Sequence, residues 1–288
     1  MSVKRNKQKS GGSPGDGARV DTESGFYVSC LGETEVLEPL TAQLKIEGMT
    51  AGDLCQITAA EDIAAVISRV PLSEYGQEQL AVNLTGLDWV AEKGTRHEAI
   101  VQGFSSRATV IPLRFGTIFL TQDAIQRFME QHRDSITMMI AKLRGKEEWG
   151  LDVYFDRELL LEALGSRNAS VRDLEGRIAA APPGQGYLMS KSLQALRQQS
   201  AREEIQKVLE AIAAATSAYP SLQLGLPKFS AAGRAEIGGR FAFLVDRDRF
   251  EAFRAQAETL AGDYRDLGLR MELTGPLPPY SFVDELKG

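Results

Sequence analysis

Histidine is the side chain best suited to proton transfer near neutral pH, and the sequence contains only two, His97 and His132. Both fall on the apolar stripes of predicted helices, where a histidine is expected to be a core residue satisfied by a hydrogen bond. The alternative is a metal site completed by carboxylates such as Glu98 or Glu130. Two histidines on separate helices lack the ligand spacing of metal sites, so we expect no metal.

The other reactive side chains show no catalytic pattern. Cys30 and Cys55 lie in apolar, strand-like runs, which favours two buried free thiols; a disulfide between them is the alternative. The sequence has no nucleophile-elbow, P-loop or dinucleotide-binding motif. Gly184-Gln185-Gly186 could cradle an anion before a predicted helix, but the following Gly of a phosphate loop is missing. We therefore expect no enzymatic activity and no cofactor, and a protein that acts by binding another protein.

Composition and charge narrow the class further. The 288 residues are 43% hydrophobic and 25% charged, and 33 Lys and Arg against 39 Asp and Glu give a net charge of −6. This acidic balance argues against nonspecific nucleic-acid binding. No apolar stretch approaches the ~20 residues that span a bilayer, so we expect no membrane insertion. Lysines and Gly, Ser and Pro residues fill the N-terminus, which predicts a disordered basic tail over residues 1–24 and a cytoplasmic protein.

Residues 25–145 show a mixture of strand and helix patterns. Phe26 to Leu31 has the aromatic and β-branched content of a strand, and residues 53–60 and 63–70 read as a hairpin. A helical period begins at Asp88, and a second helical stretch runs from about Thr121 to Arg144. Gly145 follows as a helix stop. These patterns predict an N-terminal α+β domain over residues 25–145.

Residues 146–274 have the order of a ferredoxin-like domain. Trp149 to Phe155 alternates apolar and polar residues, as a strand with one buried face does. After this strand comes a stretch with a weak helical pattern up to Pro182-Pro183. A long predicted helix over about 186–219 follows it. Strands near 222–226 and 236–245, a helix over 249–261 and a last strand near 269–273 complete the order β-α-β-β-α-β, with a helical insertion after the first strand.

The third strand of this order raises an alternative function. Residues 239–245, Gly-Arg-Phe-Ala-Phe-Leu-Val, lie where RNA-recognition domains stack bases on aromatic side chains. The Arg and Gly are transposed relative to that motif, and Asp246 replaces its last aromatic residue. We expect Phe241 and Phe243 to pack inside the protein, with an RNA-binding module as the alternative.

Residues 275–288 begin with a proline-rich run that we expect not to continue a sheet. Tyr280 and Phe282 are predicted to anchor this tail across the two domains. The alternative is an extended polyproline ligand for an aromatic groove on a partner.

Several separate segments resemble the gas vesicle accessory proteins of the GvpL/GvpF family. They are residues 66–75 (VISRVPLSEY), Asp88-Trp89 with the helix through Ala99, residues 112–117 (PLRFGT), 143–155 (LRGKEEWGLDVYF), Gly186-Tyr187-Leu188 and 273–283 (LTGPLPPYSFV). The resemblance covers nearly all of the chain from Phe26 to Val283. It implies a two-domain α+β protein with a ferredoxin-like second domain and no enzymatic activity. It also implies a role in assembling gas vesicles, the gas-filled protein shells that give cells buoyancy, through contact with the very hydrophobic main shell protein and other accessory proteins.

Five residues are candidates for contact with such a partner. Arg114 lies between apolar residues and is expected either in a structural ion pair or facing a partner. Phe115 is expected in the core, and the alternation around Trp149 favours the core over an interface anchor. Tyr280 and Phe282 are expected between the domains more than on a ligand. Self-association is left open.

Overall fold

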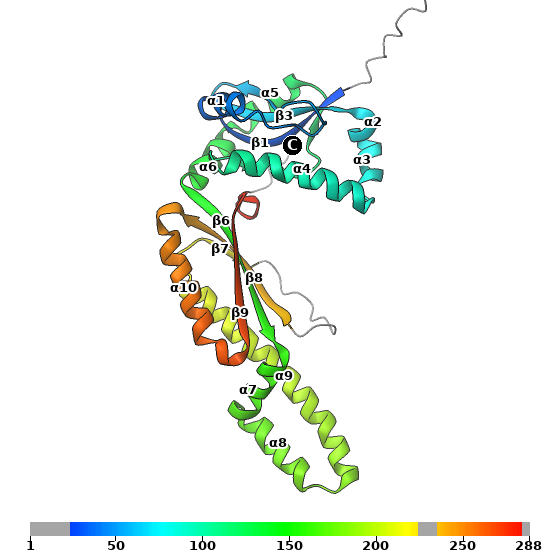
Figure 1. Ribbon diagram of the computed structural model, residues 1–288, viewed down its shortest axis with the longest axis vertical. Helices are drawn as coiled ribbons and strands as arrows, with labels where there is room; N and C mark the ends of the chain where they lie inside the picture. The colour runs from blue at the N-terminus through cyan, green and yellow to red at the C-terminus, as the bar shows by residue number, and fades with distance from the viewer. Residues whose placement is uncertain (1–23, 224–234, 284–288) are drawn as a thin grey trace, which may run out of the picture.

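The computed structural model describes residues 24–223 and 235–283, and its elements form an elongated molecule (Figure 1). One sheet with its helices forms one end, a second sheet lies in the middle, and a helical hairpin forms the far end. Both sheets are antiparallel and both carry helices, so the predicted α+β class is confirmed. The predicted tail, residues 1–24, falls outside the described part except for Ser24, which already pairs with Pro71.

The first sheet is built around β1, with the order β2-β3-β1-β4 and with β5 also paired to β1. The predicted hairpin is confirmed as β2 and β3, which pair antiparallel from Ala60↔Ile63 onward. The strands are β1 (Ser24–Glu33), β2 (Gln56–Ala60), β3 (Ile63–Pro71), β4 (Ile111–Pro112) and β5 (Ile118–Phe119).

Helices cover both faces of this sheet, because β3 is apolar on both. Ala64 and Val66 face one cluster with α1 and α4, while Ile63, Ala65 and Ile67 face another with α5 and α6. The helices are α1 (Thr34–Leu44), α2 (Leu72–Tyr75), α3 (Gln77–Asn83), α4 (Leu87–Ser105), α5 (Gln122–Gln131) and α6 (Arg133–Leu143).

The prediction of one continuous helix from Thr121 to Arg144 is wrong. His132, with φ −106° and ψ 12°, leaves the helical conformation and separates α5 from α6. The apolar stripe continues across the break, with Ile125 and Ile136 in the same core cluster, which is why its periodicity did not reveal the break. Gly145, at φ +72°, follows the C-cap residue of α6, in agreement with the predicted helix stop.

The second sheet has the strand order β7-β8-β6-β9, with every pairing antiparallel. Its strands are β6 (Lys146–Asp156), β7 (Ser221–Gln223), β8 (Ala235–Asp246) and β9 (Leu269–Leu277). The alternation read around Trp149 is confirmed, because Trp149, Leu151, Val153 and Phe155 all face one core. The predicted strand over 222–226 matches β7 only to Gln223, and residues 224–226 lie outside the described residues.

Helices pack on one face of this sheet and extend beyond it (Figure 1). Gly238 and Gly239 of β8 permit the close approach of α9, since a Cβ on Gly239 would lie 2.6 Å from Leu209 Cδ2. Asp156 and Asn168 cap α7 and α8 with their side chains. The helices are α7 (Arg157–Arg167), α8 (Ala169–Ala180), α9 (Pro183–Ala215) and α10 (Phe250–Asp263).

The proline-rich run departs from its prediction. β9 continues through Gly275 and Pro276 to Leu277, which pairs with Glu148 across an irregular register. Pro276 is tolerated because β9 is an edge strand, where one backbone side needs no partner in the sheet. After it, η3 (Tyr280–Phe282) turns toward the first sheet.

One core cluster joins the two sheets. It combines residues of β1, β3, α5 and α6 with Ala242 and Leu244 of β8 and with Phe282. The other two clusters each belong to one sheet and its helices.

Candidate functional site

Segments far apart in the sequence meet in one aromatic cluster next to α4. The aromatic cluster consists of Tyr27, Tyr75, Trp89, His97, Phe115 and Tyr280. All except Tyr27 lie in the segments on which the family resemblance was based. Those segments are therefore linked through a shared packing site.

The rings of this cluster contact one another edge to face or tilted. The centroid of Phe115 lies 5.8 Å from that of His97 and 5.9 Å from that of Trp89. Tyr27 lies 5.6 Å from His97, and Tyr280 lies 6.2 Å from it. These separations are those of favourable aromatic pairs. His97 is thus surrounded by rings from β1, the loop before β5, and η3.

Hydrogen bonds fix the imidazole of His97 at both nitrogens. The hydroxyl of Tyr27 lies 2.9 Å from Nδ1, and that of Tyr280 lies 2.8 Å from Nε2. A neutral imidazole has one donor and one acceptor nitrogen, so it satisfies one tyrosine in each role. The expectation of a hydrogen-bonded core histidine is confirmed for His97. His132 is half-buried against Phe128 instead.

Burial keeps this hydrogen-bonded set uncharged near neutral pH. Removal from water lowers the pKa of His97 to about 4, and a hydrogen bond from the imidazole to the backbone carbonyl of Leu113 opposes this only partly. Burial also raises the pKa of the hydroxyls of Tyr27 and Tyr280. A histidine uncharged from about pH 5 upward is suited to holding η3 in place rather than to exchanging protons near neutrality.

Further bonds attach the residues after β9 to both sheets. The backbone N–H and the hydroxyl of Ser281 donate to the carboxylate of Glu148, at 3.0 and 2.7 Å. Lys142 Nζ donates to the carbonyl of Phe282 at 2.9 Å. Burial raises the pKa of Glu148, while the two bonds from Ser281 lower it. The segment thus contacts β6 and α6 as well as α4.

The structure brings together four of the five predicted contact residues around this segment. Phe115 and Tyr280 belong to the aromatic cluster, and Phe282 is buried in the core cluster that joins the sheets. Arg114 is exposed beside Phe115. Of the five residues, only Arg114 is exposed.

Trp149 lies apart from the aromatic cluster, in the core of the second sheet. Its ring stacks on Phe250 at 4.0 Å between centroids. The backbone of Gly275 passes against the indole, where an added Cβ would lie 2.6 Å from Cε3. The indole of Trp149 therefore packs directly against the backbone at the start of the proline-rich run.

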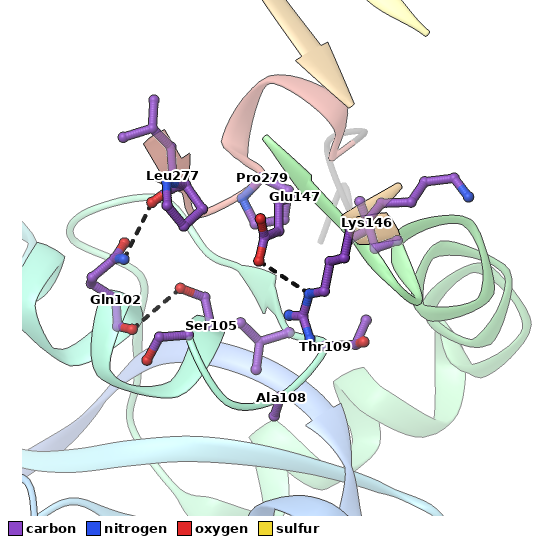
Figure 2. A pocket seen from close by; sticks show the side chains of 13 residues that line it. Gln102, Ser105, Ala108, Thr109, Lys146, Glu147, Leu277 and Pro279 are labelled. Carbon is purple, nitrogen blue, oxygen red and sulfur yellow. Dashed lines mark hydrogen bonds and ion pairs between the residues drawn. The ribbon is translucent and has the colours of Figure 1, made fainter. Parts of the chain in front are cut away.

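A small cleft separates the end of α4 from the end of β9 and the residues that follow it. Figure 2 shows Gln102 and Ser105 on one side of it and Leu277 and Pro279 on the other. Its volume of about 80 Å³ is below the ~300 Å³ that small-molecule sites usually need. Of its two cationic residues, Arg247 pairs with Glu147 at 3.1 Å and Lys146 pairs with Asp246 at 2.8 Å. The cleft therefore suits a few waters or one side chain better than a cofactor or a phosphate.

No group of three or more potential metal ligands occurs among the residues that the structure describes. Cys30 and Cys55 are both free and buried, as predicted. Within residues 24–223 and 235–283, no helix is both long and apolar enough to cross a membrane.

The RNA-binding alternative conflicts with the structure. It requires Phe241 and Phe243 to be exposed on the sheet, whereas both are buried against the helices in the second core. Phe243 packs on Phe253 of α10 at 4.9 Å. Aromatic side chains held in this way cannot stack on bases, so the alternative is wrong.

An exposed apolar surface at the corner between α3 and α4 escaped the sequence reasoning. The α3–α4 corner consists of Val82, Leu84 and Leu87, which are 62%, 47% and 86% exposed. The signal for it was an apolar residue at every second or third position around Gly86, outside the stripe that α4 buries. Exposed apolar residues gathered this closely mark interaction surfaces more often than single ones do.

Comparisons with known proteins agree on one class, the gas vesicle proteins. The family described as "Gas vesicle synthesis protein GvpL/GvpF" matches residues 25–284. Gas vesicle protein L of Streptomyces sp. (strain CB03234) is 28% identical over 77% of this chain and 80% of its own length. Gas vesicle protein L1 of Halobacterium salinarum is 25% identical over 91% of this chain and 92% of its own length.

A solved structure shows the same fold. The crystal structure of the gas vesicle protein GvpF from Anabaena sp. PCC7120 superposes with a TM-score of 0.64 at 15% identity, covering 91% of this chain and 97% of that one. This chain belongs to the GvpL/GvpF family of gas vesicle proteins, as the resemblance predicted. Its role is therefore in gas vesicle assembly.

Proposed function

We propose that this protein binds the main gas vesicle shell protein, other assembly proteins, or both, and acts as a chaperone or nucleating factor beside the growing vesicle in the cytoplasm. The observation that carries the proposal is the α3–α4 corner in a member of a gas vesicle family. The proposed role requires no catalytic group and no cofactor.

The physical need for such a partner follows from the shell. A subunit that will face gas exposes apolar surface to water before it is assembled, at a cost of roughly 25 cal/mol per Å². Complete burial of the α3–α4 corner against that surface would contribute about 3–6 kcal/mol, from the usual gain per apolar side chain and the exposures above. That is enough for reversible protection, and too little to hold a subunit permanently.

The charged residues around the α3–α4 corner indicate which kind of partner surface would bind there. Glu78, Asp88 and Glu92 are exposed on α3 and the start of α4. A partner that presents apolar residues flanked by Lys or Arg would match both features. Arg114, the exposed member of the predicted set, is a second candidate contact. Phe115 and Tyr280 pack in the aromatic cluster beside α4, whereas Trp149 and Phe282 are buried in the other two core clusters and would act only by stabilising the fold.

We also infer the domain organisation expected from the sequence, an N-terminal α+β domain over 25–145 and a ferredoxin-like domain over 146–274. The strand order β7-β8-β6-β9, with helices on one face, supports the ferredoxin-like assignment. Contacts of Tyr280, Ser281 and Phe282 with α4, β6 and α6 support a C-terminal segment, 275–288, that docks across both domains, although residues 284–288 lie outside the described part.

The direct test is a pull-down of this protein against each co-expressed gas vesicle protein, the main shell subunit included. We expect saturable binding that the variant Leu87→Gln weakens about 5- to 30-fold, because about 1–2 kcal/mol of apolar burial is lost. Met138→Gln on α6 is the matched control, since Met138 is 66% exposed and α6 packs on the opposite face of the first sheet from α4.

Two results would contradict the proposal. Binding to none of these proteins by the folded chain would leave the family membership as an account of the fold alone. Binding that Leu87→Gln and Met138→Gln weaken equally would exclude the α3–α4 corner as the contact surface.

A further inference from the structure

β9 forms a long free edge of the second sheet. Among the described residues it pairs with β6 on one side and with no strand on the other. The opposite edge, β7, is only three residues long within those residues. A free edge presents backbone N–H and C=O groups that can pair with a further strand.

The side chains of β9 divide cleanly between the two faces of the sheet. Leu269, Met271 and Leu273 face the helices and pack on the second core. Arg270 and Glu272 face away from the helices, and their side chains are 57% and 47% exposed. Within its own chain Arg270 contacts Glu272 and lies over the ring of Tyr154.

The segment Leu269-Arg270-Met271-Glu272-Leu273 can pair favourably with a second copy of itself that runs in the opposite direction. In an antiparallel pair centred on Met271, every Leu faces a Leu, Met271 faces its own copy, and each Arg faces a Glu. We propose that the β9 edge binds the β9 edge of a second copy of this chain, and that this joins the two four-stranded sheets into one continuous sheet. Arg270 then lies opposite Glu272 of the partner subunit, and Glu272 lies opposite the partner's Arg270.

Charge selects this register over its neighbours. A two-fold axis perpendicular to the sheet keeps the helices of both copies on one side, so residues of the same face oppose one another. Centring the pair on Arg270 would place two arginines opposite each other, and centring it on Glu272 would place two glutamates opposite each other. Directly opposed like charges destabilise a sheet, whereas opposite charges stabilise it.

Charged residues on an edge strand usually prevent association. Here the two signs alternate with an apolar residue between them, so the same charges that repel in shifted registers attract in the centred one. The contact is confined to one strand edge and its flanks, which is a small interface, and the dimer should therefore form reversibly with concentration. The proposal is independent of the proposed binding of shell protein.

Charge-swap variants test the register directly by sedimentation velocity over a range of concentrations. Arg270→Glu alone, or Glu272→Arg alone, makes every charge pair repulsive, and each should weaken dimerisation by about tenfold or more. The double variant Arg270→Glu with Glu272→Arg restores opposite charges and should recover the wild-type dimer. An equimolar mixture of the two single variants should form a heterodimer, because every pair across it is complementary. Both positions are exposed, so all variants should unfold at the wild-type temperature.

A disulfide test locates the symmetry axis. Cα atoms of directly opposed residues in an antiparallel pair lie ~4.5–5.5 Å apart, within the range that a disulfide bridges. Met271→Cys should therefore cross-link into a covalent dimer under mild oxidation. Leu273→Cys is the matched control, because Leu273 faces Leu269 of the partner subunit and should stay monomeric. The native Cys30 and Cys55 are buried and should not interfere.

Three outcomes would overturn the proposal. A wild-type chain that remains monomeric at every concentration, with no cross-link through Met271→Cys, leaves the edge free or available to an extended segment of another protein. Self-association that is indifferent to the charge swaps places the interface elsewhere. Equal cross-linking by Met271→Cys and Leu273→Cys excludes the centred register.

Discussion

Acid should destabilise this protein through the buried imidazole of His97, and the size of the effect can be worked out. His97 is 4% exposed, and both its nitrogens are hydrogen-bonded to tyrosine hydroxyls. Burial lowers its pKa from 6.5 to about 4 in the folded protein. In the unfolded chain the imidazole returns to water and titrates near its ordinary value.

Between these two pKa values the unfolded chain binds more protons at His97 than the folded protein does. The free energy of unfolding therefore falls as the pH falls from about 6.5 toward 4. At pH 4 the loss reaches about 3 kcal/mol, a large fraction of the stability of an ordinary domain.

Neighbouring carboxyls act in the opposite direction. Burial raises the pKa of Glu98 and of Glu148, and a carboxyl with a higher pKa in the folded state gains stability as it is protonated. The informative quantity is therefore the difference between the wild type and His97→Gln, since both proteins carry these carboxyls.

The assay is urea unfolding of both proteins from about pH 7 to about pH 4. We expect the wild type to exceed His97→Gln in stability at neutral pH, and the difference to shrink by about 3 kcal/mol at the acidic end. Glutamine keeps a donor and an acceptor for the two tyrosines but does not titrate in this range. A difference that stays constant within about 0.5 kcal/mol would refute the reasoning, because it would mean that the folded protein accommodates the charged imidazole.

Three further predictions concern packing and burial. Phe282→Ala should cost about 3–5 kcal/mol in urea unfolding, because Phe282 is buried in the core cluster that joins the sheets; a loss under 1 kcal/mol would show that this cluster is not one cooperative core. Gly238→Ala should destabilise by about 1–3 kcal/mol, since the new Cβ would overlap the ring of Phe155; an unchanged melting temperature would show that the ring moves freely. Cys30 and Cys55 should react with a thiol reagent only after unfolding, because burial raises the pKa of both thiols, that of Cys55 to about 11; fast labelling of the native protein would contradict their placement.

Local patterns predicted those elements whose physics is local. The alternation from Trp149 to Phe155 specifies a strand with one buried face, and Gly145 ends a helix because it adopts positive φ without a steric penalty. The break at His132 was missed, because an apolar stripe continues through it when both helices pack on one core. The extension of β9 through Pro276 was missed because whether a strand lies at an edge depends on the whole sheet.

Part of the candidate site could likewise be predicted from the sequence, and part of it could not. Phe115, Tyr280 and Phe282 were singled out in sequence and do gather around the residues after β9. The partner of Tyr280 could not be predicted, because His97 lies 183 positions away and only the folded chain brings them together. The α3–α4 corner was missed because a sequence shows which residues are apolar but not which of them remain uncovered.

The sequence by itself determined the class of this protein: an α+β chain of the GvpL/GvpF family whose strands and helices follow from side-chain periodicity and from Gly and Pro. Only the tertiary structure decided which aromatic side chains enclose His97, that Phe241 and Phe243 are buried, and that β9 has a free edge. The physical reason is that periodicity reports the environment of a residue relative to its own helix or strand. Burial and free edges depend on contacts between elements that are distant in sequence.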